Sequence, residues 1–315
     1  MSSSSTVVVR VPATSANLGP GFDSLGLALC LYDEVEASVF EPAGAPAVEV
    51  GVEGEGAGEL DTGEGHLIIR AMRATFERAG VPQPTGLRLR CLNRIPHARG
   101  LGSSSAAICA GILAARALAA PGLSDDEVFA LATEMEGHPD NVAPCLFGGL
   151  TIAWSDLSGN PSKLKLSPHG GVRPVVCVPR TRLSTEEARG LLPKDVPHAD
   201  AAANAGRAAL LIAALTQRPE MGLLLAATED RLHQAYRAPA MPRTAELVQR
   251  LREAGVPAVV SGAGPTVLAL GAADTHDLIA SKAGSDWHIQ PLDVDQSGAR
   301  VIFPRHADAS STLKE

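Results

Sequence analysis

A glycine- and serine-rich loop that leads directly into a long apolar segment, together residues 94–120, restricts the fold more than any other part of this chain. Apolar residues occupy nearly all sides of the helix that the segment predicts, and only Arg116 interrupts them. A helix that is apolar all round is buried rather than placed on the surface. Any site at the start of this helix is therefore fixed to the core of the protein.

The loop itself has the composition of an anion-binding site. The start of a helix carries unpaired N–H groups and the positive end of the helix dipole. Gly100 and Gly102 let the backbone approach a phosphate closely, and Ser103, Ser104 and Ser105 can cap the helix, bind phosphate oxygens or hold a metal ion. An ordinary capped loop is the alternative. Neither the lysine-bearing P-loop nor a Gly-x-Gly-x-x-Gly motif is present, so a nucleotide-handling enzyme would bind phosphate through backbone and hydroxyl groups.

Composition limits the class of protein further. The chain has 315 residues, of which 45% are hydrophobic and 20% charged, which is typical of a globular protein with room for two domains. A net charge of −8 argues against nucleic acid and acidic membranes as partners. The five cysteines form no Cys-x-x-Cys pair and indicate a reducing compartment. With no signal peptide or membrane-spanning run in the sequence, we expect a soluble cytoplasmic protein.

Hydrophobic periodicity predicts a mixed order of strands and helices, and hence an α+β chain of two domains. The first strand is expected to end at Pro12, and a polar stretch at 155–171, rich in Ser, Pro and Gly, is the expected domain junction. The expected strands are 7–11, 25–39, 48–52, 86–92 and 173–178, with a turn into a strand at 147–154 and a strand–loop–strand at 258–270. The expected helices are 66–79, 124–136, 185–191, 198–215, 219–228 and 244–254.

Three further loops carry polar side chains beside Gly and Pro. In residues 12–26, Asn17 and Asp23 lie in a turn after a strand, where such residues often only bond their own backbone. Residues 134–141 place a Glu, a His, an Asp and an Asn around a helix end. These are more polar side chains than a helix cap needs, and they would suit Mg²⁺. A plain helix-stop turn is the alternative. Residues 260–270 form a small glycine loop between strands, a weak signal alone.

Together, residues 12–26, 96–107, 136–144 and 261–270 resemble, in the same order, the motifs of the GHMP-type small-molecule kinases. Within that superfamily the chain is most similar to the homoserine kinases. The resemblance implies the GHMP kinase fold: an N-terminal lobe like the second domain of ribosomal protein S5 and a C-terminal ferredoxin-like lobe. We place these at residues 1–160 and 161–315, with the active site between them.

The resemblance also implies a nucleotide site that uses ATP and Mg²⁺. Glu136 and Ser104 are the implied metal ligands, with Glu134 in reserve, and Asp140, Asn141 and Ser104 are the implied catalytic residues. Whether Asp140 acts as a general base stays open. His66 stands where many family members have Asn, beside the adenosine. The residues implied to bind ATP are Pro96, Arg99, Gly100, Leu101, Gly102, Ser103, Ser104, Ser105 and Ala106.

The implied substrate is L-homoserine, phosphorylated by ATP on its side-chain hydroxyl in threonine biosynthesis. An arginine fork suits the carboxylate of such a substrate. The alternatives are a mevalonate-, sugar- or diphosphocytidyl-polyol-type GHMP kinase, a non-catalytic small-ligand sensor on the same fold, and a protein–protein scaffold. A homodimer is compatible with the sequence. The residues implied to contact the substrate are Asn17, Asp23, His138, Thr185, Arg189 and Arg237.

Overall fold

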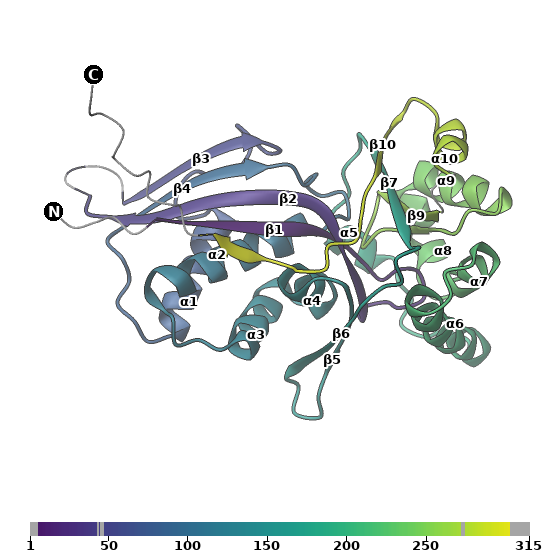
Figure 1. The fold of residues 1–315 in the computed structure, drawn as a ribbon, viewed down its shortest axis with the longest axis horizontal. Coiled ribbons are helices and arrows are strands. Elements are labelled where there is room, and N and C mark those ends of the chain that lie inside the picture. Colours follow the sequence, from purple (N-terminus) through teal and green to yellow (C-terminus); the bar gives the residue numbers. More distant parts are fainter. Residues whose placement is uncertain (1–5, 43, 45–46, 272–274, 303–315) are drawn as a thin grey trace, which may run out of the picture.

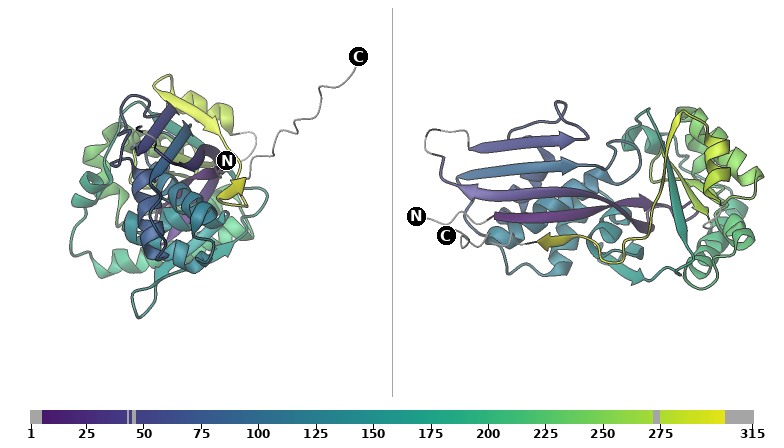
Figure 2. Two further views of the ribbon diagram at one scale, coloured as in Figure 1. Left: turned by 90° about the vertical axis from the view of Figure 1, so that its left-hand side faces the viewer. Right: turned by 45° about the horizontal axis from the view of Figure 1, so that its top comes forward.

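Two sheets, each accompanied by its own helices, lie toward opposite ends of an elongated molecule (Figure 1 and Figure 2). The computed structural model describes residues 6–302 apart from 43, 45–46 and 272–274. The α+β class and the two-lobed architecture expected from the sequence are confirmed in this part of the chain. No helix among the described residues has both the length and the apolar character needed to cross a bilayer.

The N-terminal sheet has the strand order β11-β1-β2-β4-β3, and β5 and β6 extend it from β2. In the first part of β1, every second side chain is buried, as the β-branched run predicted. Pro12 does not end this strand as expected, because the register with β2 shifts between Pro12 and Ala13 and this irregularity accommodates the residue without an N–H. The strands are β1 (Thr6–Ala16), β2 (Leu25–Phe40), β3 (Val48–Gly54), β4 (Gly86–Asn93), β5 (Leu150–Ser155), β6 (Pro161–Leu166) and β11 (Arg300–Ile302).

Helices cover one face of this sheet (Figure 2). The predicted capping box is present, with the Ser124 side chain and Glu127 bonding each other's backbone N–H. Pro139, which was expected to stop one helix, also begins the next, because its missing N–H costs nothing in a first turn. The helices of this lobe are α1 (Leu67–Arg78), α2 (Ser103–Ala119), α3 (Asp125–Glu136) and α4 (Pro139–Phe147).

The second sheet has the order β10-β7-β9-β8, with all its pairs antiparallel. One of its two central strands, β7, is buried from Pro174 onward, so helices must cover this sheet as well. The strands are β7 (Arg173–Pro179), β8 (Ala258–Val260), β9 (Val267–Gly271) and β10 (Trp287–Pro291). The helices are α5 (Thr185–Gly190), α6 (His198–Thr216), α7 (Met221–Ala227), α8 (Gln234–Arg237), the 3₁₀ turn η1 (Ala238–Ala240), α9 (Pro242–Glu253) and α10 (His276–Ala283).

The two sheets do not divide the chain at one point. Strand β6, inside the stretch expected to be a junction, pairs with β5 of the first sheet along its whole length. After the second sheet the chain returns to the first, where Val301 of β11 lies opposite Val9 of β1. The proposed division at residue 160 stays a prediction, and the last described strand lies in the N-terminal lobe.

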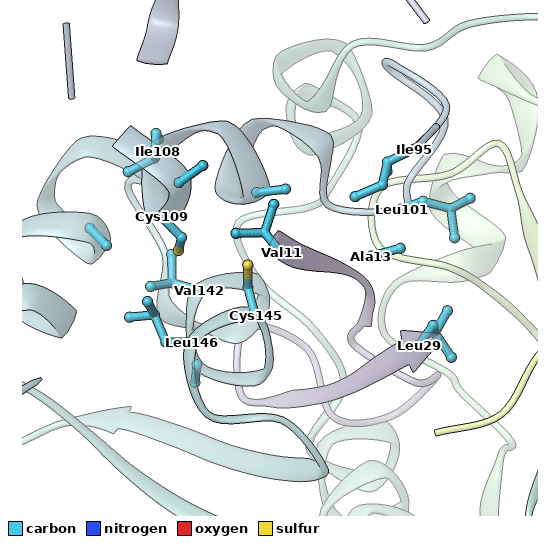
Figure 3. Close-up of a cluster of buried hydrophobic side chains, with 14 of the residues drawn as sticks. Val11, Ala13, Leu29, Ile95, Leu101, Ile108, Cys109, Val142, Cys145 and Leu146 are labelled. Carbon is cyan, nitrogen blue, oxygen red and sulfur yellow. The ribbon is translucent and has the colours of Figure 1, made fainter. Parts of the chain in front are cut away.

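The core of the N-terminal lobe lies directly behind the serine-rich loop (Figure 3). Leu101 of the loop, Ile108 and Cys109 of α2, and Cys145 of α4 belong to one cluster of buried side chains. The helix that looked apolar all round is buried as expected. This packing fixes the start of α2 relative to α4, and it therefore positions the polar residues that both helices carry at that end.

Candidate active site

The start of α2 is a tight backbone turn wedged between two other loops. Gly102 has a φ of 72° and Gly100 a φ of 76°, a region that side chains disfavour. A Cβ on Gly102 would lie 2.0 Å from Oγ1 of Thr14, and one on Gly100 would lie 2.2 Å from the carbonyl oxygen of Ser261. Gly102 supplies no side-chain hydrogen bond to the first turn. The arrangement suits an anion held by backbone N–H groups.

Two cavities meet at Ser103 and Ser104. One, of about 240 Å³, is lined by charged and polar residues of both lobes and by the first turn of α2. The other, of about 320 Å³, lies in the N-terminal lobe and has mainly apolar walls, including Val11, Val35 and Leu67. A ligand that spans the helix start can therefore place an apolar group on one side and a reactive group on the other.

Glu136 lies against the start of α2. Its Oε2 accepts a hydrogen bond from Oγ of Ser104 and its Oε1 accepts one from Oγ of Ser105, both at 2.7 Å. Glu134, the reserve candidate, instead pairs with Arg78 at 2.5 Å. No cluster of three or more His, Cys, Asp or Glu residues that could hold a metal occurs in the described residues. One carboxylate beside hydroxyls is nevertheless the donor set Mg²⁺ takes when phosphates supply the other ligands.

The start of α4 brings a second polar group into the charged cavity. Asp140, only 1% exposed, lies 2.6 Å from Nδ1 of His138 through its Oδ1. Burial tends to lower the pKa of His138, but the hydrogen bond and negative charge of Asp140 outweigh it and leave this pKa raised. Asn141 accepts a hydrogen bond from Oγ1 of Thr14 at 2.7 Å. The structure therefore brings all three predicted residues of this motif to one wall.

Charges of both signs line this cavity: Arg189 and Arg237 come from the C-terminal lobe, and Glu136 and Asp140 from the N-terminal lobe. Asp23 is not among the lining residues but pairs with Arg189. Arg189 of α5 donates two hydrogen bonds to the carboxylate of Asp23, at 3.0 and 2.5 Å. Arg237 is only 2% exposed, donates to the carbonyl of Gly262 at 2.9 Å, and leaves its buried Nε without a partner. Burial lowers the pKa of this guanidinium. A buried cation with an unused donor suits an anionic ligand.

The other predicted residues divide into two groups. Thr185 lines the charged cavity, Ala106 lines the apolar one, and Ser103 and Ser104 line both. Arg99 pairs with Glu55 at 3.3 Å and, like Pro96, lines a separate groove, and Leu101 is buried in the core. The side chains of these last three residues therefore do not line either cavity at the helix start, and their part in nucleotide binding stays a prediction.

The first and fourth motifs meet at Gly262. Its carbonyl accepts hydrogen bonds from Nδ2 of Asn17 at 3.0 Å and from Arg237, and its N–H donates to the carbonyl of Ala16. Sequence reasoning did not single out Phe22, which also lines the charged cavity. The available signal was its place between Asn17 and Asp23, in a chain with only 3% aromatic residues.

Comparison with known proteins agrees with this geometry. Residues 66–149 match the GHMP kinases N terminal domain, and residues 202–288 match the GHMP kinases C terminal domain. The fold and the site thus define a GHMP kinase. The chain is 58% identical over 299 residues to homoserine kinase of Streptomyces coelicolor and 56% identical over 299 residues to that of Streptomyces avermitilis.

These alignments cover 94% of this chain, and 94% and 95% of the relatives. The crystal structure of homoserine kinase from Cytophaga hutchinsonii superposes with a TM-score of 0.80 at 26% identity, over 96% of this chain and 99% of that one. The chain belongs to the homoserine kinase family.

Proposed function

We propose that this protein transfers the γ-phosphoryl group of ATP to the side-chain hydroxyl of L-homoserine and releases O-phospho-L-homoserine and ADP. The observation that carries the proposal is the start of α2, where Ser103 and Ser104 separate an apolar cavity from a charged one. Such a helix start can hold a chain of phosphates between a nucleoside and an acceptor. Family membership supports the same reaction.

In this proposal the adenosine occupies the apolar cavity, and the phosphates lie over the first turn of α2. Gly100 and Gly102 let this turn pack closely against Ser261 and Thr14, and N–H groups of the turn would bind the phosphate oxygens. Glu136 and Ser104 would hold Mg²⁺, which when bound neutralises charge on the phosphates. Phosphoryl transfer depends mostly on such positioning and charge stabilisation.

The charged cavity would hold the amino acid. Arg237 offers a buried, incompletely bonded guanidinium to its carboxylate, and Arg189 adds a second. Asp23 offers a carboxylate to its ammonium group. Because Asp23 and Arg189 already form an ion pair at 2.5 Å, a zwitterion laid along the pair meets the opposite charge at each end.

Asp140 and Asn141 would orient the attacking hydroxyl. Both residues lie at the start of α4 and line the same cavity as Ser104 and Glu136. His138 holds Asp140 at 2.6 Å, and Thr14 holds Asn141 at 2.7 Å, so neither side chain turns freely. This fixed arrangement supports a role in presenting the hydroxyl to the γ-phosphate.

We also expect the enzyme to work in the cytoplasm, and a homodimer is compatible with its sequence. Its cysteines are free, and burial raises the pKa of Cys91 and of Cys177 to about 12. Thiols of this kind are unreactive and suit a reducing compartment.

The direct test is ADP release with ATP and Mg²⁺ against a panel of alcohols: L-homoserine, L-threonine, L-serine, mevalonate and galactose. We expect strong preference for L-homoserine, measured as kcat/KM. Activity with another alcohol would support a kinase but assign it a different substrate. ATP binding without turnover of any of them would favour the small-ligand sensor.

Replacing Arg237 by methionine should raise the KM for L-homoserine about 30-fold, because a buried charge pair loses one partner. The KM for ATP should change little, since Arg237 does not line the apolar cavity. Arg252→Met is the matched control. The pKa of Arg252 is also lowered by burial, although this guanidinium is only partly buried, and it donates to the carbonyl of Leu225 at 2.7 Å, away from the site. Equal effects of both substitutions would contradict the assignment.

A further inference from the structure

The ring of Phe22 lies close to both arginines of the charged cavity. The guanidinium carbons of Arg189 and Arg237 lie 5.2 and 5.7 Å from the centroid of this ring. These distances fall within the range of about 6 Å in which the ring quadrupole attracts a cation. Arg189 comes from α5 and Arg237 from α8, so the ring joins two separate elements of the C-terminal lobe.

The positive charges of Arg189 and Arg237 repel each other across this cavity. Burial lowers the pKa of Arg237, and the nearby charge of Arg189 adds to this, against the opposing charges of Asp230, Asp23 and Asp140. Arg189 is balanced directly by Asp23, but Arg237 has no carboxylate within ion-pair distance among the described ion pairs. The face of the aromatic ring therefore adds negative potential beside a guanidinium that is otherwise held by the carbonyl of Gly262.

The ring is itself held from the C-terminal lobe. His233 stacks on it with a centroid distance of 4.2 Å and an interplanar angle of 6°. Nδ1 of His233 lies 2.9 Å from Oδ1 of Asp230. Asp230 is fixed in turn by N–H groups of Leu232 and Gln234 and by Nδ2 of Asn204. These bonds hold the carboxylate charged, and its pKa is about 2 even though burial opposes ionisation.

The loop that carries Phe22 is equally constrained. Asn17, Leu18 and Asp23 all have positive φ values, between 49° and 69°. Oδ1 of Asn17 accepts the N–H of Asp23 at 2.9 Å and so closes the loop around Phe22. Backbone strain of this kind persists only where the surroundings impose it, which is common at functional sites.

We propose that Phe22 is a positioning residue for substrate binding, whose aromatic face holds Arg189 and Arg237 together as one carboxylate-binding fork, with His233 fixing the ring from behind. This inference rests on the proposed function, because the carboxylate is that of the amino-acid substrate. It adds a determinant of substrate affinity that carries no charge and makes no hydrogen bond.

The test compares Phe22→Leu, which keeps an apolar side chain without a π face, with Phe22→Tyr, which keeps the ring. We expect Phe22→Leu to raise the KM for L-homoserine about tenfold, with the KM for ATP and kcat changed less than twofold. The KM of Phe22→Tyr for L-homoserine should stay within about threefold of the value for the unchanged protein. Phe40→Leu is the matched control, since Arg88 lies 4.7 Å from the centroid of that ring, outside the site.

If the unchanged protein is active on L-homoserine, three results would overturn this inference and leave the proposed function intact. They are an unaltered KM for L-homoserine in Phe22→Leu, equal increases in the Leu and Tyr variants, and a parallel increase in the KM for ATP. No turnover of L-homoserine by the unchanged protein would instead remove the proposed function, and this inference with it. Thermal unfolding of each variant checks that the proteins compared are folded.

Discussion

Replacing Glu136 by glutamine is expected to lower kcat about 1,000-fold, which corresponds to about 4 kcal/mol of transition-state stabilisation. Glutamine keeps the size of the side chain but removes the negative charge that faces the start of α2. Its amide also cannot accept hydrogen bonds from both Ser104 and Ser105, as the two oxygens of Glu136 do at 2.7 Å. We expect the Mg²⁺ concentration for half-maximal rate to rise as well, measured by titration at saturating ATP and L-homoserine.

Glu134→Gln is the control for this prediction. Glu134 lies two positions earlier on the same helix, but its carboxylate pairs with Arg78 on the surface. Exposed ion pairs contribute little to stability, so this variant should keep nearly full activity and an unchanged Mg²⁺ requirement. If Glu134→Gln loses as much as Glu136→Gln, the effect comes from the helix and not from a metal ligand. An unchanged Mg²⁺ titration in Glu136→Gln would reject the ligand role by itself.

Much of the fold could be predicted from local sequence patterns. Alternating burial in β1, the capping box at Ser124 and the all-round apolar character of α2 each act within a few residues, so the sequence displays them directly. The strand β6 was missed because Ser and Lys residues accompany its leucines and none of its residues is fully buried. Strand β6 forms because it pairs with β5, and such a pairing is hard to predict from the sequence of either strand alone.

The candidate site shows the same limit more sharply. The residue types and motifs could be read from the sequence, and so could the glycines at the start of α2. The sequence does not reveal which of these side chains contact each other. Asp23 pairs with Arg189, 166 positions away, and Thr14 donates a hydrogen bond to Asn141, 127 positions away. Such contacts depend on how elements far apart in the sequence pack against each other, not on local chemistry. For the same reason Phe22 looked like part of a turn until His233 and the two arginines were placed around it.

Gly102→Ala is expected to lower kcat/KM for ATP more than 100-fold, because displacements of about 1 Å in a positioning loop cost that much. The new Cβ would lie 2.0 Å from Oγ1 of Thr14 and 3.0 Å from Oδ1 of Asn141. These two atoms share a hydrogen bond at 2.7 Å. The methyl group must therefore either push the loop off the helix start or break the bond that orients Asn141, and the substitution disturbs the nucleotide and acceptor sides together.

Gly80→Ala separates this steric effect from backbone strain. Gly80 has a φ of 65°, close to that of Gly102, but a Cβ there would meet nothing within 4 Å. Gly80→Ala should lose about 1 kcal/mol in the free energy of unfolding, the cost of a left-handed conformation for alanine. Gly102→Ala should lose more, because its methyl group also collides with Thr14 and Asn141. Steady-state kinetics should find Gly80→Ala fully active and Gly102→Ala nearly inactive. If the two variants lose activity equally, the close approach of Thr14 and Asn141 to the loop has no part in catalysis.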